Sequence, residues 1–353
     1  MQEMVVKNEI AGAVTMVVTR DKILHLETIG FADVAAKKPM TPDTLFWIAS
    51  MTKPITGTAI LMLQDEAKLS VSDPVAKYLP EFAGLKTPSG KPANLTIRQL
   101  LTHTSGLGEA SGPAAQQART LADLVPIWLA APMQYEPGEK WKYTQSGINA
   151  AARIVEVVSG MSFDVFLQKG LFDPLGMKDT TWALTPAQEQ RLVGLYAAKN
   201  GSVAHTAALL PPTLYPSGGA GLCSTVPDYL RFVQMLAGNG TLDRVRVLSS
   251  ASVEEMRRKQ LPAGFPGLPP GNAAGLLMRY VDDPTAAKSP LPAGAYGWSG
   301  AYGTHFWIDP TTGLAAVWMI NLTTAGGAGS PDALEFEQMV TRACQADSRC
   351  GTR

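Results

Sequence analysis

The sequence has little cysteine and no excess of charge of either sign. Three cysteines occur among 353 residues, and 30 lysines and arginines balance 30 aspartates and glutamates. A net charge of zero speaks against nucleic acid as the main partner, and the absence of a basic run speaks against an anionic membrane surface. Neither nucleic acid nor an anionic membrane surface is therefore expected as a partner.

Long apolar runs and an apolar leader are also missing. The longest apolar runs, such as residues 314–320, are far shorter than a membrane span, so we expect none. Residues 1–10 contain Glu3, Lys7 and Glu9 where a signal peptide would be apolar. A disulfide between Cys344 and Cys350 would suit an exported protein whose leader has been removed, and two free thiols would suit the cytoplasm. The compartment and the oligomeric state stay open.

Several common catalytic motifs are absent. The chain contains no Gly-x-Ser-x-Gly, so the nucleophile elbow of α/β-hydrolases is excluded, and His25, His205 and His305 stand alone in strand or loop contexts. It contains no His-Glu-x-x-His and no paired cysteines with zinc-ligand spacing, so no metal site is predicted. It also lacks a glycine-rich phosphate loop followed by lysine. We therefore expect no cofactor.

The stretch around Ser50 is the strongest candidate for chemistry. An extended apolar run ends there, and the helix predicted from Pro54 to Leu63 is apolar on nearly every face, as expected of a buried helix. Ser50 thus lies among the unpaired N–H groups at a helix start, where developing negative charge is stabilised. Lys53 follows one helical turn later on the same face. A serine at a helix start is also an ordinary N-cap, so this pair alone is weak evidence.

Two further segments can contribute to a site. A tyrosine packed against a lysine can act as a proton acceptor, because a nearby ammonium favours the phenolate, and Tyr143 precedes a predicted helix at residues 146–159. The glycines in residues 296–303 allow a strand edge to lie close to a substrate, and its N–H groups can complete an oxyanion hole with that of Ser50. Packing alone is the competing explanation for both segments.

The order of the segments predicts an α/β fold of the α+β type. Strand-like runs lie near both ends of the chain, with a hairpin around residues 20–22 and another around residues 309–313, and helix-like runs lie between them. We expect one antiparallel sheet built from both chain ends and flanked by helices, with an inserted, mainly helical lobe. The predicted boundaries are residues 1–85 with 285–353 for the sheet domain and 86–284 for the helical domain. Loops 104–120 and 262–296 are expected to line the pocket.

Three motifs in order carry a resemblance to a known family. They are Ser50-x-x-Lys53, Tyr143-Thr144-Gln145 and Trp298-Ser299-Gly300. This arrangement resembles the serine β-lactamase and penicillin-binding-protein superfamily. More narrowly, it is similar to the class C β-lactamase-type carboxylesterases of family VIII. Supporting phrases span residues 100–107, 174–177, 219–225 and 298–310.

The resemblance implies a β-lactamase/transpeptidase-like fold and specific roles. Ser50 would be the nucleophile, Lys53 its proton-managing partner, and Tyr143, held as a phenolate by Lys53, the general base and later the general acid. The N–H groups of Ser50 and Ala301 would form the oxyanion hole. The remaining substrate-binding positions would be those of Gln145, Trp298, Ser299 and Gly300.

Two positions depart from the β-lactamase pattern. Gln145 stands where those enzymes have asparagine, and Trp298 stands where they have a lysine. That lysine supplies positive charge for a carboxylate, whereas tryptophan offers apolar area and one N–H donor. Both changes favour an ester over a β-lactam.

The sequence therefore predicts a serine carboxylesterase that hydrolyses small to medium acyl esters through a Ser50 acyl-enzyme. The expected partner is a small-molecule ester. The alternatives are a β-lactamase or D-alanyl-D-alanine carboxypeptidase, an acyltransferase that uses the same acyl-enzyme, and a non-catalytic member that binds cell-wall fragments. The presence of Ser50, Lys53 and Tyr143 argues against the last of these.

Overall fold

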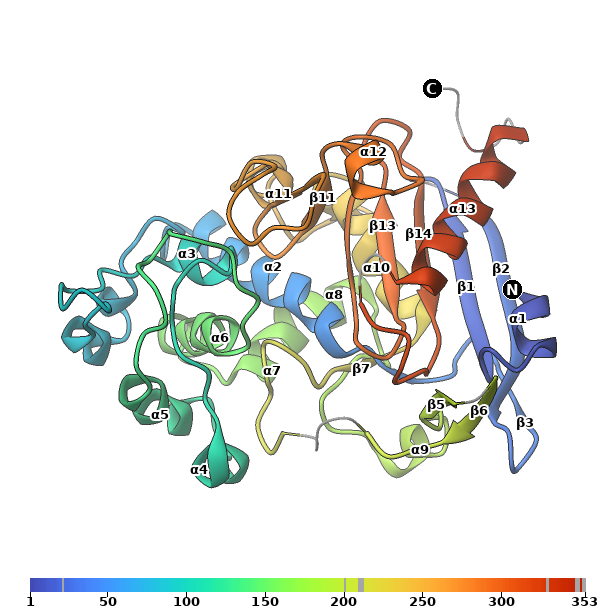
Figure 1. Cartoon of the computed structure of the whole chain (residues 1–353), viewed down its shortest axis with the longest axis horizontal. Coiled ribbons are helices and arrows are strands. Elements are labelled where there is room, and N and C mark those ends of the chain that lie inside the picture. Colours follow the sequence, from blue (N-terminus) through green and yellow to red (C-terminus); the bar gives the residue numbers. More distant parts are fainter. Residues whose placement is uncertain (21, 200, 209–212, 328–329, 347–349, 351–353) are drawn as a thin grey trace.

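A computed structural model describes residues 1–353 except 21, 200, 209–212, 328–329, 347–349 and 351–353 (Figure 1). Its α-helices are α1 (Gln2–Val6), α2 (Thr52–Asp65), α3 (Ile97–Leu101), α4 (Gly112–Gln117), α5 (Val125–Ala130), α6 (Ser146–Ser159), α7 (Phe163–Leu167), α8 (Asp173–Leu175), α9 (Pro186–Glu189), α10 (Val226–Ala237), α11 (Ser250–Arg257), α12 (Pro284–Ala287) and α13 (Pro331–Ala346). Shorter turns of other helix types are η1 (Ala49–Met51), η2 (Val75–Lys77), η3 (Pro80–Gly84), η4 (Ala122–Leu124) and η5 (Gln168–Phe172).

The main sheet combines strands from both ends of the chain. The strands of the structure are β1 (Gly12–Val18), β2 (Ile23–Asp33), β3 (Lys38–Pro39), β4 (Phe46–Trp47), β5 (Tyr196–Lys199), β6 (Ser202–His205), β7 (Cys223–Ser224), β8 (Thr241–Leu242), β9 (Val245–Arg246), β10 (Asn272–Ala274), β11 (Arg279–Val281), β12 (Tyr296–Ser299), β13 (His305–Ile308) and β14 (Ala315–Met319). The main sheet has the order β10-β11-β12-β13-β14-β1-β2-β3, and its pairs are antiparallel. In its centre Val14 pairs with Met319. The predicted fold class is confirmed.

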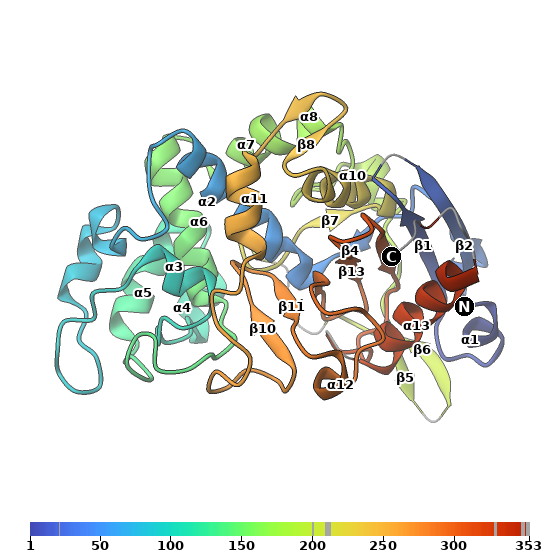
Figure 2. The same ribbon diagram turned by 90° about the horizontal axis from the view of Figure 1, so that it is seen from above.

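Helices cover both faces of this sheet. Helix α10 packs on β14 and β1 from one side, while α13 lies on the other side, where the Phe336 ring meets Trp318 at 5.5 Å (Figures 1 and 2). Every residue of β1 is buried, which fits a strand covered on both faces rather than one that alternates between core and solvent. The sheet is therefore the middle layer of three.

The helical part of the molecule is built around α2. Residues 52–63 of this helix are all buried, as its all-round apolar sequence predicts, and α6 packs along it. Helix α3 begins with a capping box, in which Thr96 and Gln99 each satisfy a backbone N–H of the other. Helix α6 spans the predicted residues 146–159 and ends at Gly160, whose φ of 71° is left-handed.

Some segments differ from the sequence-based expectation. Residues 262–296, expected to lack regular structure, contain β10, β11 and α12, because their short strands extend the edge of the main sheet. Residues 108–118, expected to be a loop, contain α4. Strands β10 and β11 fall inside the segment assigned to the helical domain, yet they belong to the sheet, and the proposed division into two domains stays a prediction.

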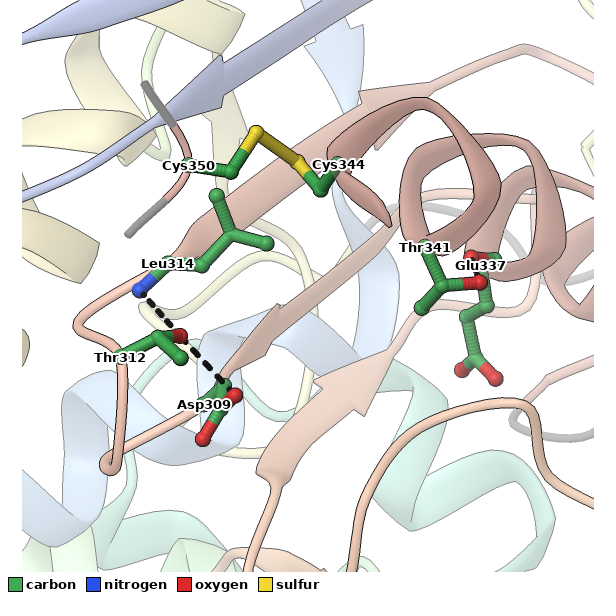
Figure 3. The surroundings of a disulfide bond; sticks show 7 residues. All are labelled: Asp309, Thr312, Leu314, Glu337, Thr341, Cys344 and Cys350. Carbon is green, nitrogen blue, oxygen red and sulfur yellow. Dashed lines mark hydrogen bonds between the residues drawn. A yellow bond between two sulfur atoms is a disulfide. The ribbon is translucent and has the colours of Figure 1, made fainter. Parts of the chain in front are cut away.

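Cys344 and Cys350 are joined by a disulfide at the end of α13, with their Cα atoms 5.3 Å apart (Figure 3). Cys223 is a buried free thiol whose pKa is raised to about 12 by burial, so it is an unreactive core residue. Within the described ranges, no helix is both long and apolar enough to cross a bilayer.

Candidate active site

Ser50 lies in a tight turn directly before α2. The turn is η1, and the preceding Ala49 has a φ of 45°, a left-handed conformation that costs energy for a residue other than glycine. Two hydrogen bonds hold the entry to this turn: the Ile48 N–H donates to the Leu222 carbonyl at 3.0 Å, and the Thr304 hydroxyl donates to the Ile48 carbonyl at 3.1 Å. The predicted position of Ser50 at the start of the central helix is confirmed.

Lys53 is fully buried beside Ser50. Its Nζ lies 3.3 Å from Ser50 Oγ, 2.9 Å from Gln145 Oε1 and 2.7 Å from the Gly219 carbonyl oxygen. Among the residues that the structure describes, Lys53 forms no ion pair. Burial therefore lowers its pKa from 10.5 to about 7, and the charge of Glu109 works in the opposite direction.

The contacts of Lys53 fit a neutral amine. A neutral amine has two N–H groups and one lone pair, and the Gln145 and Gly219 oxygens can each accept one N–H. In this neutral form the lone pair faces Ser50 and can accept its hydrogen, whereas an ammonium would donate to all three oxygens. Glycine is needed at position 219 because a Cβ there would overlap with the Gln145 amide oxygen.

Tyr143 contacts the same serine from the segment before α6. Its hydroxyl lies 2.6 Å from Ser50 Oγ, and its ring centroid lies 4.5 Å from Lys53 Nζ. Although 39% of Tyr143 is exposed, desolvation raises its pKa to about 12, while hydrogen bonding with Ser50 and Trp298 works in the opposite direction. These directions favour a phenol beside an amine and not the resting phenolate expected from the sequence, because burial penalises both charged forms.

Aromatic rings fix the orientation of Tyr143. His103 lies against it with ring centroids 4.8 Å apart, and Trp298 stacks on it at 6.4 Å. Buried His103 accepts the Thr144 N–H through Nδ1 at 3.2 Å, and burial lowers the pKa of His103 well below its usual value. His103 is thus a neutral packing group.

Gln145 and Glu109 form the support behind Lys53. The Glu109 carboxylate accepts the N–H groups of Gln145 at 2.8 Å and Ser146 at 3.0 Å, at the start of α6. Gln145 was predicted to bind substrate, but its amide oxygen bonds to Lys53 and the residue does not line the cavity described below. Sequence reasoning missed Glu109, which lies outside the recognised motifs. It also missed the Gly219 carbonyl, because the supporting phrase that begins at residue 219 gave this residue no role.

Strand β12 forms the other side of the site. Gly300 comes so close to the turn before Ser50 that a Cβ would overlap with the Ile48 carbonyl oxygen and Thr304 Oγ1. The N–H groups of Ser50 and Ala301 donate no hydrogen bond within the part of the chain that the structure describes. Both N–H groups are therefore available for an oxyanion, and the oxyanion hole at these two residues stays a prediction.

A cavity of about 440 Å³ opens in front of Ser50. The predicted residues Tyr143, Trp298, Ser299 and Ala301 line it together with Ser50. Most of the remaining wall comes from residues 268–279, as predicted for the second loop, whereas residues 104–120 do not contribute. Within the described ranges, no group of three or more His, Cys, Asp or Glu side chains is arranged to hold a metal ion.

Comparison with known proteins places this geometry in context. Residues 1–337 match the family model described as Beta-lactamase. The chain is 36% identical to Protein Rv1367c of Mycobacterium tuberculosis over 344 residues, covering 88% of this chain and 86% of that protein. It is 30% identical to Esterase EstB of Burkholderia gladioli over 358 residues, covering 92% of this chain and 89% of that protein. The structure of EstCE1, a hydrolase with promiscuous acyltransferase activity, superposes with a TM-score of 0.85 at 24% identity and covers 96% of each chain.

Proposed function

Because the chain belongs to the β-lactamase family and is a serine hydrolase, we propose that it is a carboxylesterase that cleaves uncharged esters of small to medium acyl groups. The observation that carries this proposal is the contact of Ser50 Oγ with both the Tyr143 hydroxyl and the Lys53 amine at a mostly apolar cavity. The esterase name of the Burkholderia relative supports the same choice.

Acylation uses Lys53 as the base. Ser50 Oγ attacks the ester carbonyl carbon while its proton passes to the free amine of Lys53, which a pKa of about 7 makes abundant near neutral pH. The N–H groups of Ser50 and Ala301 stabilise the oxyanion. The tetrahedral intermediate then releases the alcohol, whose oxygen takes the Tyr143 proton, and the Lys53 ammonium stabilises the phenolate that remains.

Deacylation reverses these proton movements. The Tyr143 phenolate removes a proton from water as that water attacks the acyl-enzyme, and the Lys53 ammonium returns a proton to Ser50 Oγ as the acid leaves. Each residue ends in the state in which it began. The sequence-based expectation made Tyr143 the base that removes the Ser50 proton. In this mechanism Lys53 removes that proton, and Tyr143 acts first as an acid and then as a base toward water.

The make-up of the cavity supports uncharged substrates. Trp298 occupies the position at which the family resemblance implies a lysine, and it lines the cavity with aliphatic residues such as Leu268, Leu277 and Met278. Arg279 also reaches the cavity, but its guanidinium pairs with Glu337 at 3.3 Å. Among the residues that line the cavity, no unpaired cation is therefore available to bind a carboxylate.

The test is pre-steady-state hydrolysis of p-nitrophenyl butanoate and of a chromogenic cephalosporin. We expect an ester burst equal to the enzyme concentration, absent in Ser50→Ala and unchanged in the control Ser202→Ala, a serine exposed on β6. The cephalosporin should turn over slowly or not at all. Efficient cephalosporin turnover, or a full burst in Ser50→Ala, would refute the proposal.

A further inference from the structure

A second chain of polar side chains begins at the cavity wall and runs away from Ser50. Ser299 Oγ lies 2.7 Å from His305 Nδ1, and His305 Nε2 lies 3.0 Å from Glu337 Oε1. The three residues come from β12, β13 and α13, and Figure 3 shows the Glu337 side chain projecting from α13. The mechanism above uses neither His305 nor Glu337.

Glu337 fixes which nitrogen of His305 carries a hydrogen. Its side chain is 0% exposed, and although burial alone would raise its pKa, hydrogen bonds from His305 and Ser289 and the charge of Arg279 lower it. The carboxylate is therefore ionised and can only accept hydrogen bonds. Since His305 Nε2 faces this carboxylate, Nε2 must carry a hydrogen.

The charge balance of the cluster then sets the state of the imidazole ring. The charged groups that face this cluster are Arg279 on β11 and Glu337 on α13, and the neighbour of His305 on β14 is the uncharged Trp318. A neutral ring leaves one cation opposite one anion, whereas an imidazolium would add a second buried cation. Burial of an uncompensated charge is costly, which favours the neutral ring.

A neutral ring with its hydrogen on Nε2 has a lone pair on Nδ1. The Ser299 hydroxyl must then donate its hydrogen to His305, so its oxygen presents only lone pairs to the cavity. Ser299 is two residues before Ala301, whose N–H is the candidate oxyanion donor. The acceptor therefore lies near the part of the cavity that holds the acyl carbonyl.

We propose that Glu337 and His305 are positioning residues that hold the Ser299 hydroxyl as a hydrogen-bond acceptor and thereby favour acyl groups carrying a hydroxyl near the ester carbonyl. The inference rests on the proposed esterase function and names its substrate class. It also disfavours a carboxylate at this point, because lone pairs on Ser299 repel a second acceptor.

Two esters that differ at one group provide the kinetic test. In p-nitrophenyl 3-hydroxybutanoate a hydroxyl replaces one methyl group of p-nitrophenyl 3-methylbutanoate. For each enzyme, kcat/KM for the hydroxy ester is divided by kcat/KM for the methyl ester. Dividing the wild-type ratio by the ratio for Ser299→Ala cancels the different intrinsic reactivities of the two esters. We expect a quotient of about ten, the value that one hydrogen bond supplies. A quotient of one would overturn the proposal.

The relay behind Ser299 is tested with the same pair of esters. His305→Phe keeps a ring of similar size but frees the Ser299 hydrogen, so the hydroxyl preference should fall several-fold, and Glu337→Gln should lower it in the same direction. The control Ser289→Ala removes another contact of Glu337, at 3.3 Å, and should leave the preference unchanged. If Ser289→Ala and His305→Phe had equal effects, the relay would be merely structural.

Nitrogen NMR of histidine-labelled wild type tests the hydrogen positions without any substrate. The chain has four histidines, so the signals lost in His305→Phe identify His305. We expect a neutral ring with hydrogen on Nε2 at pH 7, and a doubly protonated ring would overturn the proposal. If neither ester is hydrolysed, the esterase proposal fails while this measurement still decides the state of His305.

Discussion

Two buried ionisable groups lie behind residues that line the cavity, and their surroundings are opposite. Lys53 lies among neutral partners, two oxygens of amide type and two hydroxyl-bearing side chains, whereas Glu337 is surrounded by donors from Arg279, His305 and Ser289. The pKa of Lys53 moves toward its neutral form, and that of Glu337 moves toward its charged form. The fold thus gives Lys53 no opposite charge as a partner, at the place where a proton must move. It gives Glu337 a partner of opposite charge and several hydrogen-bond donors.

The largest effect should come from removing the uncompensated group. Lys53→Met keeps the length of the side chain but removes the amine, and we expect kcat/KM for p-nitrophenyl butanoate to fall by about a thousandfold or more, because the serine loses its base. Lys142→Met, at an exposed lysine one residue before Tyr143, is the control and should stay near wild type. A Lys53→Met variant within tenfold of wild type would mean that another group is the base.

Tyr143→Phe should have the next largest effect. The ring and its stacking on His103 and Trp298 are retained, while the proton donor to the leaving alcohol is lost, so kcat should fall by about a hundredfold or more. Tyr135→Phe removes a hydroxyl that bonds weakly to the His103 carbonyl at 3.4 Å and does not reach Ser50. Equal losses in the two variants would remove Tyr143 from the mechanism.

Glu337→Gln should affect stability more than turnover. Removing the anion leaves Arg279 and the relay without their compensating charge, so the free energy of unfolding in urea should fall by about 3 kcal/mol. Lys53→Met should instead leave this free energy unchanged or raise it, because folding no longer has to remove the Lys53 proton or bury its charge. If Lys53→Met proved the less stable variant, the contrast between the two groups would be wrong.

The pH dependence sharpens the same contrast. The base form of Lys53 is needed, so kcat/KM should rise about tenfold per pH unit below pH 7 and level off above it. Its pKa is lowered in the folded state, so between about pH 7 and 10.5 the unfolded chain binds a proton that the folded chain does not, and stability rises with pH. The stability advantage of Lys53→Met should therefore shrink from pH 7 to pH 9, and a constant difference would contradict the lowered pKa.

The smallest effect is expected from Glu109→Gln. The Glu109 charge raises the pKa of Lys53, so its removal should move the midpoint of the kcat/KM profile to lower pH, with little change in the plateau. Glu139→Gln is the control, because that carboxylate does not act on Lys53. An unchanged midpoint would show that Glu109 supports Lys53 only through its contacts with α6.

The sequence predicted the parts of the site that are local in the chain. Ser50 and Lys53 meet because one helical turn joins them, and Tyr143 and Ala301 were located through the order of the family motifs. The Gly219 carbonyl could not be predicted, because a backbone oxygen has no sequence signature. His305 was judged to stand alone because its partner Glu337 comes from a helix on the far face of the sheet. One signal was present: Glu337 interrupts the apolar face of α13 between Ala333 and Val340.

The central position of β1 has a consequence for biosynthesis. Its partner on one side is β14, where Val14 pairs with Met319, so the middle of the sheet cannot close until Met319 has been made. Synthesis proceeds at about 5 to 20 residues per second, so β14 is made roughly 15 to 60 seconds after the hairpin of β1 and β2. During this time an apolar strand edge is open to other chains, as in slow-folding proteins rich in distant contacts. Efficient production should therefore depend on chaperones that shield the first 35 residues.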